Sequence, residues 1–334
     1  MAGDVRIGMI GMGGFMHRHS EDLGKIPEAR VVAVMDPVAG NRAAHKKRHA
    51  HLAGAAEYDD WKAMLRREHL DAVVIASPHT AHFEQIMAAL DRGLHVLVEK
   101  PLVCRIDHGR KVVRKVRKTG LVLSIGYHRH TAGMYRYVRR EIAAGRIGKV
   151  EAVAAFQAQE WKRATAGTWR QAPALSGGGQ LNDSGSHLVD VILWMTGLQA
   201  DVVSAHIHNC GTPVDINSAV SVRFAGGAVG AFAVAGNAPA WWEDISIVGD
   251  RGAFHMRQGA GLTQQLGFRD AQAAVSADAL GGASVSQDFI RAIQGRQEPA
   301  APAECGLRVI ELTEAAWKSA AQGGRPVKVP RTKI

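Results

Sequence analysis

One histidine and two aspartates occur at helical spacing in the second half of the chain. Asp183, His187 and Asp190 stand at i, i+4 and i+7, so a helix over residues 182–194 would place them on one stripe, with apolar side chains on its buried side. An imidazole flanked by carboxylates is the side chain best suited to take a proton near neutral pH. His187 is therefore a candidate acid or base. For a histidine taken alone, however, a structural role on a helix that Asp183 caps is the preferred interpretation.

A lysine at the end of a buried strand is the second candidate. Residues 95–98 form a short apolar run typical of a buried parallel strand, and Glu99, Lys100 and Pro101 follow at once. Open α/β sheets bind ligands at the carboxyl ends of their strands. Because Pro101 fixes the backbone, and can take the cis form, it holds Lys100 more rigidly than a surface lysine. We expect Lys100 to face a ligand.

A glycine-rich turn follows the first strand pattern. Residues 5–10 alternate as in a strand and lead into a helical pattern through Gly11, Met12, Gly13, Gly14, Phe15 and Met16. Glycines at such a turn let the backbone approach a pyrophosphate and present amide donors to it. The next strand, residues 31–35, ends in Asp36, at the distance expected for a carboxylate that binds ribose hydroxyls. The pattern indicates a dinucleotide site; the alternative is a glycine-rich turn with an unrelated aspartate.

The charges around Asp36 bear on which dinucleotide binds. An acidic residue at this place repels a 2′-phosphate and so favours NAD over NADP. Arg42 and the basic residues 45–48 lie close enough to leave NADP open, although a solvated helix face is the plainer interpretation of that run.

The order of strand and helix patterns predicts an α/β protein with two kinds of sheet. Strands alternate with helices through the first half, which is typical of a Rossmann-like, doubly wound parallel sheet. Short strands separated by glycine-rich turns dominate the second half, which indicates antiparallel pairing. Residues 259–282 give no assignment, and helical patterns over 285–294 and 304–321 close the chain. The predicted strands cover 5–10, 31–35, 72–76, 95–98 and 121–125, then 150–159, 201–209, 217–224, 228–234, 245–248 and 253–256.

Length and composition are those of a two-domain globular protein. The 334 residues exceed the size at which one core keeps growing, and 46% hydrophobic with 22% charged residues is ordinary. No apolar run approaches the roughly 20 residues of a membrane helix. The strand pattern that begins at Val5 leaves no room for a signal peptide, so we expect a cytoplasmic protein with no membrane partner. Cys104, Cys210 and Cys305 have neither metal nor disulfide spacing, which agrees with a reducing compartment.

Two further partner classes are not expected. The net charge of +10 is densest over residues 105–118, which form an amphipathic helix pattern with the basic residues outward, and no nucleic-acid-binding motif accompanies it. The sixteen histidines include close pairs, but none has an Asp, Glu or Cys complement at a recognised spacing, so we expect no tight metal site. These pairs are His17/His19, His45/His49, His128/His130 and His206/His208.

Candidate substrate contacts follow the last strand of the first half. His128 and Arg129 lie at the carboxyl end of that strand, near the expected place of Lys100; a basic crossing between domains is the alternative. A long irregular segment, residues 160–179, contains Trp169 and Arg170. Indole faces stack on the C–H faces of sugars, and guanidinium groups bind carboxylates, phosphates or hydroxyls.

Together these motifs resemble the glucose-fructose oxidoreductase/inositol dehydrogenase/MocA family. The resemblance covers nearly the whole chain, and Glu99-Lys100-Pro101 is its most specific mark. It implies a dinucleotide-binding domain over 1–125 and a substrate-binding α+β domain over 126–334, with an open, mostly antiparallel sheet whose outer face forms contacts in a dimer or tetramer. The last helices are free to pack back on the first domain. The motifs are Gly11-x-Gly13 with His19, Asp36, Ser77-Pro78 with His82, Glu99-Lys100-Pro101, and Asp183-x-x-x-His187.

The resemblance also implies an activity: NAD(P)-dependent oxidation of a secondary alcohol in a sugar, inositol or related polyol. Lys100, Asp183 and His187 would be catalytic, and the substrate would contact His128, Arg129, Trp169, Arg170 and Asp183. The family's alternatives are a glycosidase that uses NAD transiently and a non-catalytic regulator that binds a sugar or dinucleotide. The cofactor would contact Gly11, Met12, Gly13, Gly14, Phe15, Met16, Asp36, Ser77, Pro78, His82, Glu99 and Lys100.

Overall fold

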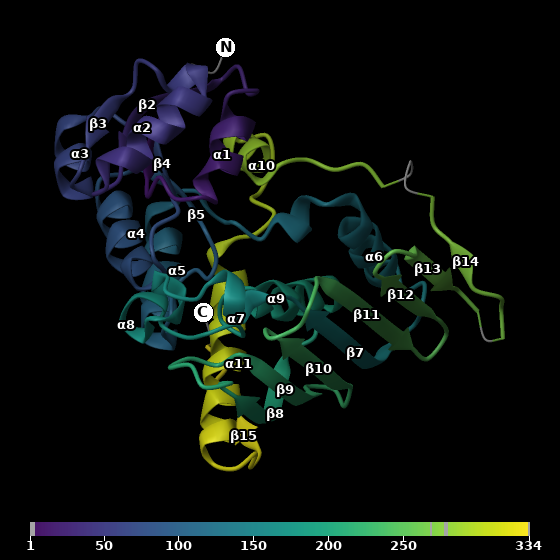
Figure 1. Ribbon diagram of the computed structural model, residues 1–334. Coiled ribbons are helices and arrows are strands. Elements are labelled where there is room, and N and C mark those ends of the chain that lie inside the picture. Colours follow the sequence, from purple (N-terminus) through teal and green to yellow (C-terminus); the bar gives the residue numbers. More distant parts are fainter. Residues whose placement is uncertain (1–3, 268, 277–279, 333–334) are drawn as a thin grey trace.

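The computed structural model describes residues 4–267, 269–276 and 280–332. Each half of the chain forms one sheet with its own helices packed on it (Figure 1). The last two helices return to the boundary between the halves. No helix among the described residues has the length and apolar character to cross a membrane.

The first sheet is parallel throughout and confirms the predicted doubly wound arrangement. Its strand order is β3-β2-β1-β4-β5-β6, so the order reverses between β1 and β4, where the carboxyl ends of the strands leave a crevice. The three-residue strand β3 was not predicted, because so short a run carries no periodic signal. The strands are β1 Val5–Ile10, β2 Ala29–Met35, β3 Ala56–Tyr58, β4 Ala72–Ile75, β5 His95–Val98 and β6 Leu123–Ile125.

Five helices connect these strands and cover both faces of the sheet. The inner strands β1, β4 and β5 are almost completely buried, as expected when helices pack on both sides, whereas the edge strand β3 is partly exposed. The helices are α1 Met16–Leu23, α2 Ala39–Arg48, α3 Trp61–Arg67, α4 His82–Asp91 and α5 Ile106–Thr119.

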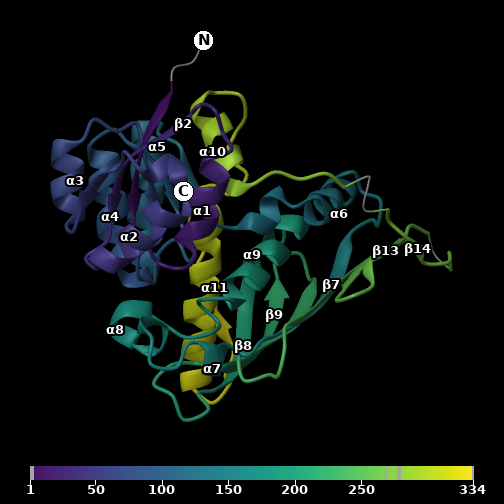
Figure 2. The same ribbon diagram turned by 45° about the horizontal axis from the view of Figure 1, so that its top comes forward.

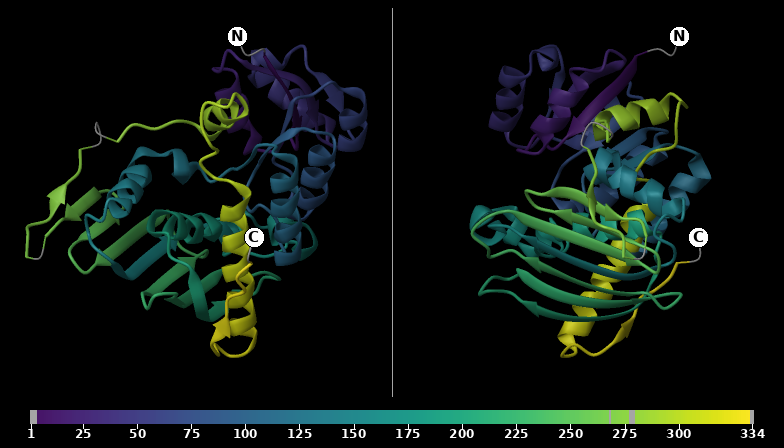
Figure 3. Two further views of the ribbon diagram at one scale, coloured as in Figure 1. Left: turned by 180° about the vertical axis from the view of Figure 1, so that it is seen from behind. Right: turned by 90° about the vertical axis from the view of Figure 1, so that its right-hand side faces the viewer.

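The second sheet has nine strands in the order β14-β13-β12-β11-β7-β10-β9-β8-β15. All pairs are antiparallel except β7 and β10, so the prediction of a mostly antiparallel sheet is confirmed. Helices lie on one face only, and the other face is open (Figure 3). The strands are β7 Val150–Ala158, β8 Ala200–His208, β9 Asn217–Phe224, β10 Val229–Ala235, β11 Trp242–Gly249, β12 Ala253–Arg257, β13 Gly261–Gln265, β14 Ala273–Ala274 and β15 Val327–Lys328.

The helices of the second half begin at α6 (Gly133–Ala143). Helix α9 (Gly185–Thr196) begins later than predicted, so Asp183 lies in the turn before it and does not share a helical stripe with His187. The irregular segment 160–179 contains the short helices α7 (Trp161–Ala164) and α8 (Pro173–Ser176). Of the unassigned residues 259–282, β13 and β14 account for seven, while 268 and 277–279 lie outside the described residues.

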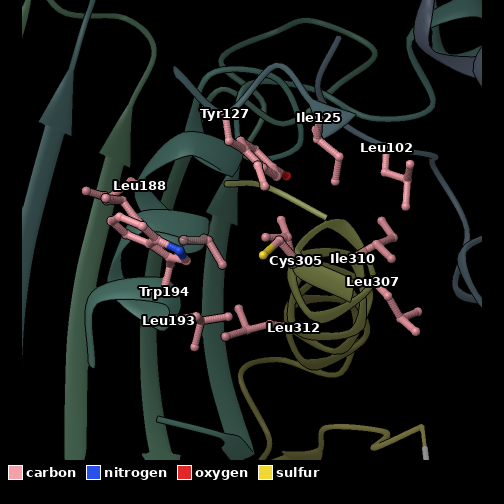
Figure 4. Close-up of a cluster of buried hydrophobic side chains, with 14 of the residues drawn as sticks. Leu102, Ile125, Tyr127, Leu188, Leu193, Trp194, Cys305, Leu307, Ile310 and Leu312 are labelled. Atoms are coloured by element: carbon pink, nitrogen blue, oxygen red, sulfur yellow. The ribbon is translucent and has the colours of Figure 1, made fainter. Parts of the chain in front are cut away.

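The last two helices connect the halves of the molecule. Phe289 of α10 (Val285–Ile293) is completely buried in the core of the first sheet, so the chain returns there after building the second sheet. Helix α11 (Ala303–Ala321) then runs between the two halves (Figure 2). Its Leu307 and Ile310 lie toward Leu102 of the first half, and other side chains pack toward α9 (Figure 4). This packing fixes the two halves relative to each other.

Candidate active site

A cavity of about 710 Å³ lies where the carboxyl ends of the first sheet meet the second domain. Ten of the predicted site residues line it, and they come from both halves of the chain. They are Phe15, Ser77, Glu99, Lys100, His128, Arg129, Trp169, Arg170, Asp183 and His187.

Lys100 reaches this cavity from the end of β5, after which the Lys100–Pro101 bond is cis. Its side chain is 11% exposed, and its Nζ donates a hydrogen bond to Oδ1 of Asp183. The other carboxylate oxygen of Asp183 accepts from Trp161 Nε1 at 2.8 Å and from Arg170 Nε at 3.1 Å. Asp183 is therefore a fixed anchor for the lysine, formed by residues far apart in the sequence.

The charge of Asp183 is stabilised by these partners. Burial alone would raise its pKa, but the positive charges of Lys100 and Arg170, with His79 nearby, outweigh burial and hold the pKa well below its usual range. The side chain is thus an anion at neutral pH, and it compensates the lysine charge inside a poorly hydrated cavity.

His187 has different neighbours from those predicted. Neither carboxylate bonds to it, because Asp183 pairs with Lys100 and Asp190 lies 2.6 Å from Nε2 of His130. The expected imidazole flanked by carboxylates is therefore wrong. The ring of His187 lies 4.5 Å from that of His128, and its Nδ1 has no hydrogen-bond partner among the described residues. Burial, with the nearby positive groups, lowers its pKa well below the usual value, so the imidazole is neutral at neutral pH.

The glycine-rich turn has the shape that a dinucleotide requires. Gly11 has φ +86°, and a Cβ there would lie 2.7 Å from the Ser77 amide nitrogen, so only glycine lets the ends of β1 and β4 approach so closely. Nothing lies within 4 Å of a Cβ built on Gly13 or Gly14, which leaves open space over the start of α1. A pyrophosphate fits at such a helix N-terminus.

Asp36 stands at the end of β2, next to this turn. Its carboxylate accepts hydrogen bonds from the amides of Met12 and Val38 at 2.8 and 2.9 Å, which fix its position. Arg42 and Lys46, two of the cations that left NADP open, both pair with Glu57, at 3.2 and 3.0 Å. The residues around Asp36 therefore fit a ribose diol and offer no unpaired cation from this pair to a 2′-phosphate.

Three of the predicted cofactor contacts have buried side chains that do not face the cavity. His82 is completely buried, and its ring nitrogens lie 2.8 and 3.1 Å from the carbonyl oxygens of Pro101 and Ser77, so a direct cofactor contact is excluded and the residue positions both segments. The side chains of Met12 and Met16 are likewise buried in the core, which leaves only their backbone for a ligand.

Glu99 lines the cavity and also joins three elements. Its Oε1 lies 2.9 Å from His19 Nε2 of α1, whose Nδ1 lies 3.1 Å from Ser286 Oγ of α10. A Cβ on Gly126 would lie 2.4 Å from the carboxylate, so the chain after β6 needs glycine there. Burial would raise the pKa of Glu99, but the hydrogen bond from His19 and nearby positive charges lower it.

One group of cavity residues was missed. Glu243 of β11 accepts hydrogen bonds from Arg129, from Tyr135 Oη at 3.0 Å and from Gln157 Nε2 at 3.1 Å, and it is 9% exposed. The predicted strand began at Ile245. Extending its alternation back by two residues would have placed Glu243 on the inward face, where an acid is unusual.

Two family models match this chain. Residues 5–127 match the model described as the Gfo/Idh/MocA oxidoreductase family, NAD-binding Rossmann fold, and residues 135–255 match the family's C-terminal domain. The chain belongs to this family. Its first half is accordingly an NAD-binding domain, in agreement with the glycine-rich turn and Asp36.

Individual members of the Gfo/Idh/MocA family are distant in sequence. The scyllo-inositol 2-dehydrogenase (NAD(+)) of Bacillus subtilis is 27% identical over 262 residues, which is 76% of this chain and 74% of that enzyme. The D-glucoside 3-dehydrogenase of Escherichia coli is 28% identical over 206 residues, 61% of this chain and 57% of that enzyme. A levoglucosan dehydrogenase solved with NADH has the same fold, with a TM-score of 0.86 at 20% identity over 98% of this chain and 100% of that one.

Proposed function

We propose that this protein is an NAD-dependent dehydrogenase that oxidises a secondary alcohol of a sugar, an inositol or a related polyol. The observation that carries the proposal is the convergence of a lysine, paired with a buried aspartate, and a neutral histidine on one cavity next to the glycine-rich turn. An ammonium donor and an uncharged imidazole are the two groups that removal of a hydroxyl proton requires.

In this mechanism the protein's side chains handle the proton. His187 takes the proton of the substrate hydroxyl, because its imidazole is neutral and lines the cavity. Lys100 donates a hydrogen bond to the same oxygen and stabilises the negative charge that develops there. Asp183 holds the ammonium group in place and compensates its charge. NAD, when bound, supplies the chemistry of hydride acceptance.

The cavity walls suit a polyhydroxylated ring. Trp169 offers an indole, with the Arg170 guanidinium 4.5 Å from the centre of its ring. On the other side Arg129, whose Nη1 has no partner among the described residues, stands with Glu243 as a donor and acceptor pair. Hydroxyl groups of a sugar can bond to both kinds of group. The names of the relatives, an inositol and a glucoside dehydrogenase, agree with this substrate class.

We also propose NAD over NADP as the physiological cofactor, and a homo-oligomer formed through the open face of the nine-stranded sheet. The pairing of Arg42 and Lys46 with Glu57 supports NAD as the cofactor.

The homo-oligomer is supported by exposed aromatic side chains on or next to the open face of the sheet, Phe156 at 40% and Trp242 at 47%.

A substrate panel tests the function. Purified protein is incubated with inositols, aldoses, glycosides and anhydrosugars, each with NAD or NADP, and absorbance of the reduced cofactor is followed. We expect NADH formation with at least one cyclic polyol and a higher kcat/KM with NAD. Glycoside cleavage without net NADH would favour the transient use of NAD, and binding without turnover across the panel would favour a regulator. Either result would contradict the proposal.

A further inference from the structure

Three histidines meet behind the glycine-rich turn, outside the catalytic cavity. His17 lies in the first turn of α1, while His45 and His49 lie in the last turn of α2 and directly after it. Nδ1 of His17 is 3.1 Å from Nε2 of His49, and the rings of His17 and His45 are stacked with centroids 3.6 Å apart. One nitrogen from each ring lies within 4.8 Å of the other two.

The sequence predicted no metal site here, because the pair His45/His49 has no complement nearby along the chain. The fold supplies the third imidazole from α1, 28 residues before His45. His49 lies just past the end of α2 with an extended backbone, so its ring reaches the other two through the turn that follows the helix.

We propose that His17, His45 and His49 form a binding site for a divalent transition-metal ion, Zn²⁺ in particular. Three neutral imidazoles are a donor set that zinc accepts, with a fourth position left to water. The separation of 3.1 Å between the His17 and His49 nitrogens is close to that of two ligands on one tetrahedral zinc ion, where each lies about 2.0–2.1 Å from the metal. The rings of His17 and His45 are parallel, so one of them turns when both bind the same ion.

The three rings differ in how far they are buried. His45 is 1% exposed and His49 is 9% exposed, whereas His17 is half-buried and gives an ion a path from solvent. Arg48 is the nearby charge that opposes a cation, and Glu21 is the nearby charge that favours one.

The position of the site connects it to the dinucleotide turn. Nε2 of His45 lies 3.2 Å from the carbonyl oxygen of Gly13, and His17 directly follows the last residue of the turn, Met16. A metal ion held by these side chains would tie α1 and α2 together at the place where the pyrophosphate is expected. The inference does not depend on the substrate proposed above.

Calorimetric titration of Zn²⁺ into the full chain, freed of metal with EDTA and made without a polyhistidine tag, tests the site. We expect one zinc ion per chain, and a visible absorption of tetrahedral Co²⁺ when cobalt replaces zinc. His17→Gln and His49→Gln should each weaken zinc binding by more than about tenfold. Among the described residues the ring of His49 contacts His17, His45 and His51, so its variant tests the ligand away from the glycine-rich turn.

The matched control is His51→Gln, since His51 lies 6.0 Å from the His49 ring but outside the triplet. It should bind zinc as the wild type does, and circular dichroism should report the same fold for all variants. Absence of stoichiometric zinc binding by the wild type would overturn the proposal. So would zinc binding that both ligand variants retain unchanged.

Discussion

Lys100 and His187 reach the cavity from different domains and do not touch, so each needs its own support. Asp183 supports Lys100 with one carboxylate oxygen and is held by Trp161 and Arg170 through the other. His187 has no such partner and is defined by the packing of α9. The roles of these residues can therefore be separated by substitution.

Asp183→Asn tests the anchor. The amide keeps the size of the side chain but removes the charge that holds the Lys100 ammonium, so we expect kcat/KM to fall by about 10²–10³. NAD affinity, measured by quenching of protein fluorescence, should fall much less than kcat/KM, because Asp183 lies outside the glycine-rich turn and affects the cofactor only through Lys100. Glu160→Gln, an exposed change in the same region, is the control. Activity within twofold of the wild type would exclude the anchoring role.

The sequence predicted which residues form the site better than it predicted how they pair. Asp183 and His187 were found by their spacing together with the family resemblance, but the partner of Asp183 lies 83 residues away and no local pattern links them. His82 was recognised as part of a motif, yet its burial between two backbone carbonyls makes it a support for the site. Contacts of this kind depend on how the strands assemble.

At the scale of elements, segments with a strong apolar periodicity were predicted from the sequence, and segments of only a few residues were not. The first sheet and the long helices followed from apolar spacing, whereas β3 and the short helices of residues 160–179 have too few residues for a period to emerge. Helix α10 shows the other limit: its amphipathic pattern was visible, but only the structure places it on the first domain.

Phe289→Ala tests whether α10 belongs to the first domain's core. The side chain is fully buried in the cluster that also contains side chains of β1 and β5, so its loss should lower the free energy of unfolding by about 3–5 kcal/mol, measured by urea denaturation. Arg291→Ala, on the exposed side of the same helix, should change it by less than about 0.5 kcal/mol. Equal effects of the two substitutions would mean that this packing does not stabilise the protein.

At the scale of the whole molecule, one face of the second sheet lacks a covering layer in the described residues (Figure 3). A pocket on this face is lined by Phe156 and by alanines and serines, together with His206, Asp244 and Arg257. Trp242 is also exposed, at 47%. Exposed aromatic side chains on an uncovered sheet favour a second copy as its partner.

Phe156→Glu tests this oligomer. A carboxylate in the middle of the face would be desolvated at the interface, so we expect the mass measured by light scattering after size exclusion to drop to that of one chain. Val38→Glu, an equivalent change on the exposed surface of the first domain, should leave the mass unchanged. A wild type that is monomeric at micromolar concentration would contradict the proposed assembly.

Buried histidines should make the whole protein sensitive to acid. Burial lowers the pKa of His79 to about 3, whereas the unfolded chain binds a proton there near pH 6.5. Acidification across this window therefore favours unfolding, and this residue should contribute about 1.4 kcal/mol of lost stability per pH unit. His79→Asn should flatten the dependence of unfolding free energy on pH, while exposed His208→Asn should not. If the unfolding free energy of His79→Asn depended on pH as steeply as that of the wild type, the His79 imidazole would not cause the sensitivity to acid.

The chemical step in the cavity is tested most directly by single-turnover NADH formation, at saturating NAD and with an active polyol from the panel. Wild type, His187→Gln and Lys100→Met are compared, with the substrate also deuterated at the carbinol carbon. The proposed roles predict slower transfer from the deuterated substrate in the wild type and a rate at least about 100-fold lower in each variant. NADH formation at the wild-type rate in either variant would contradict the assignment.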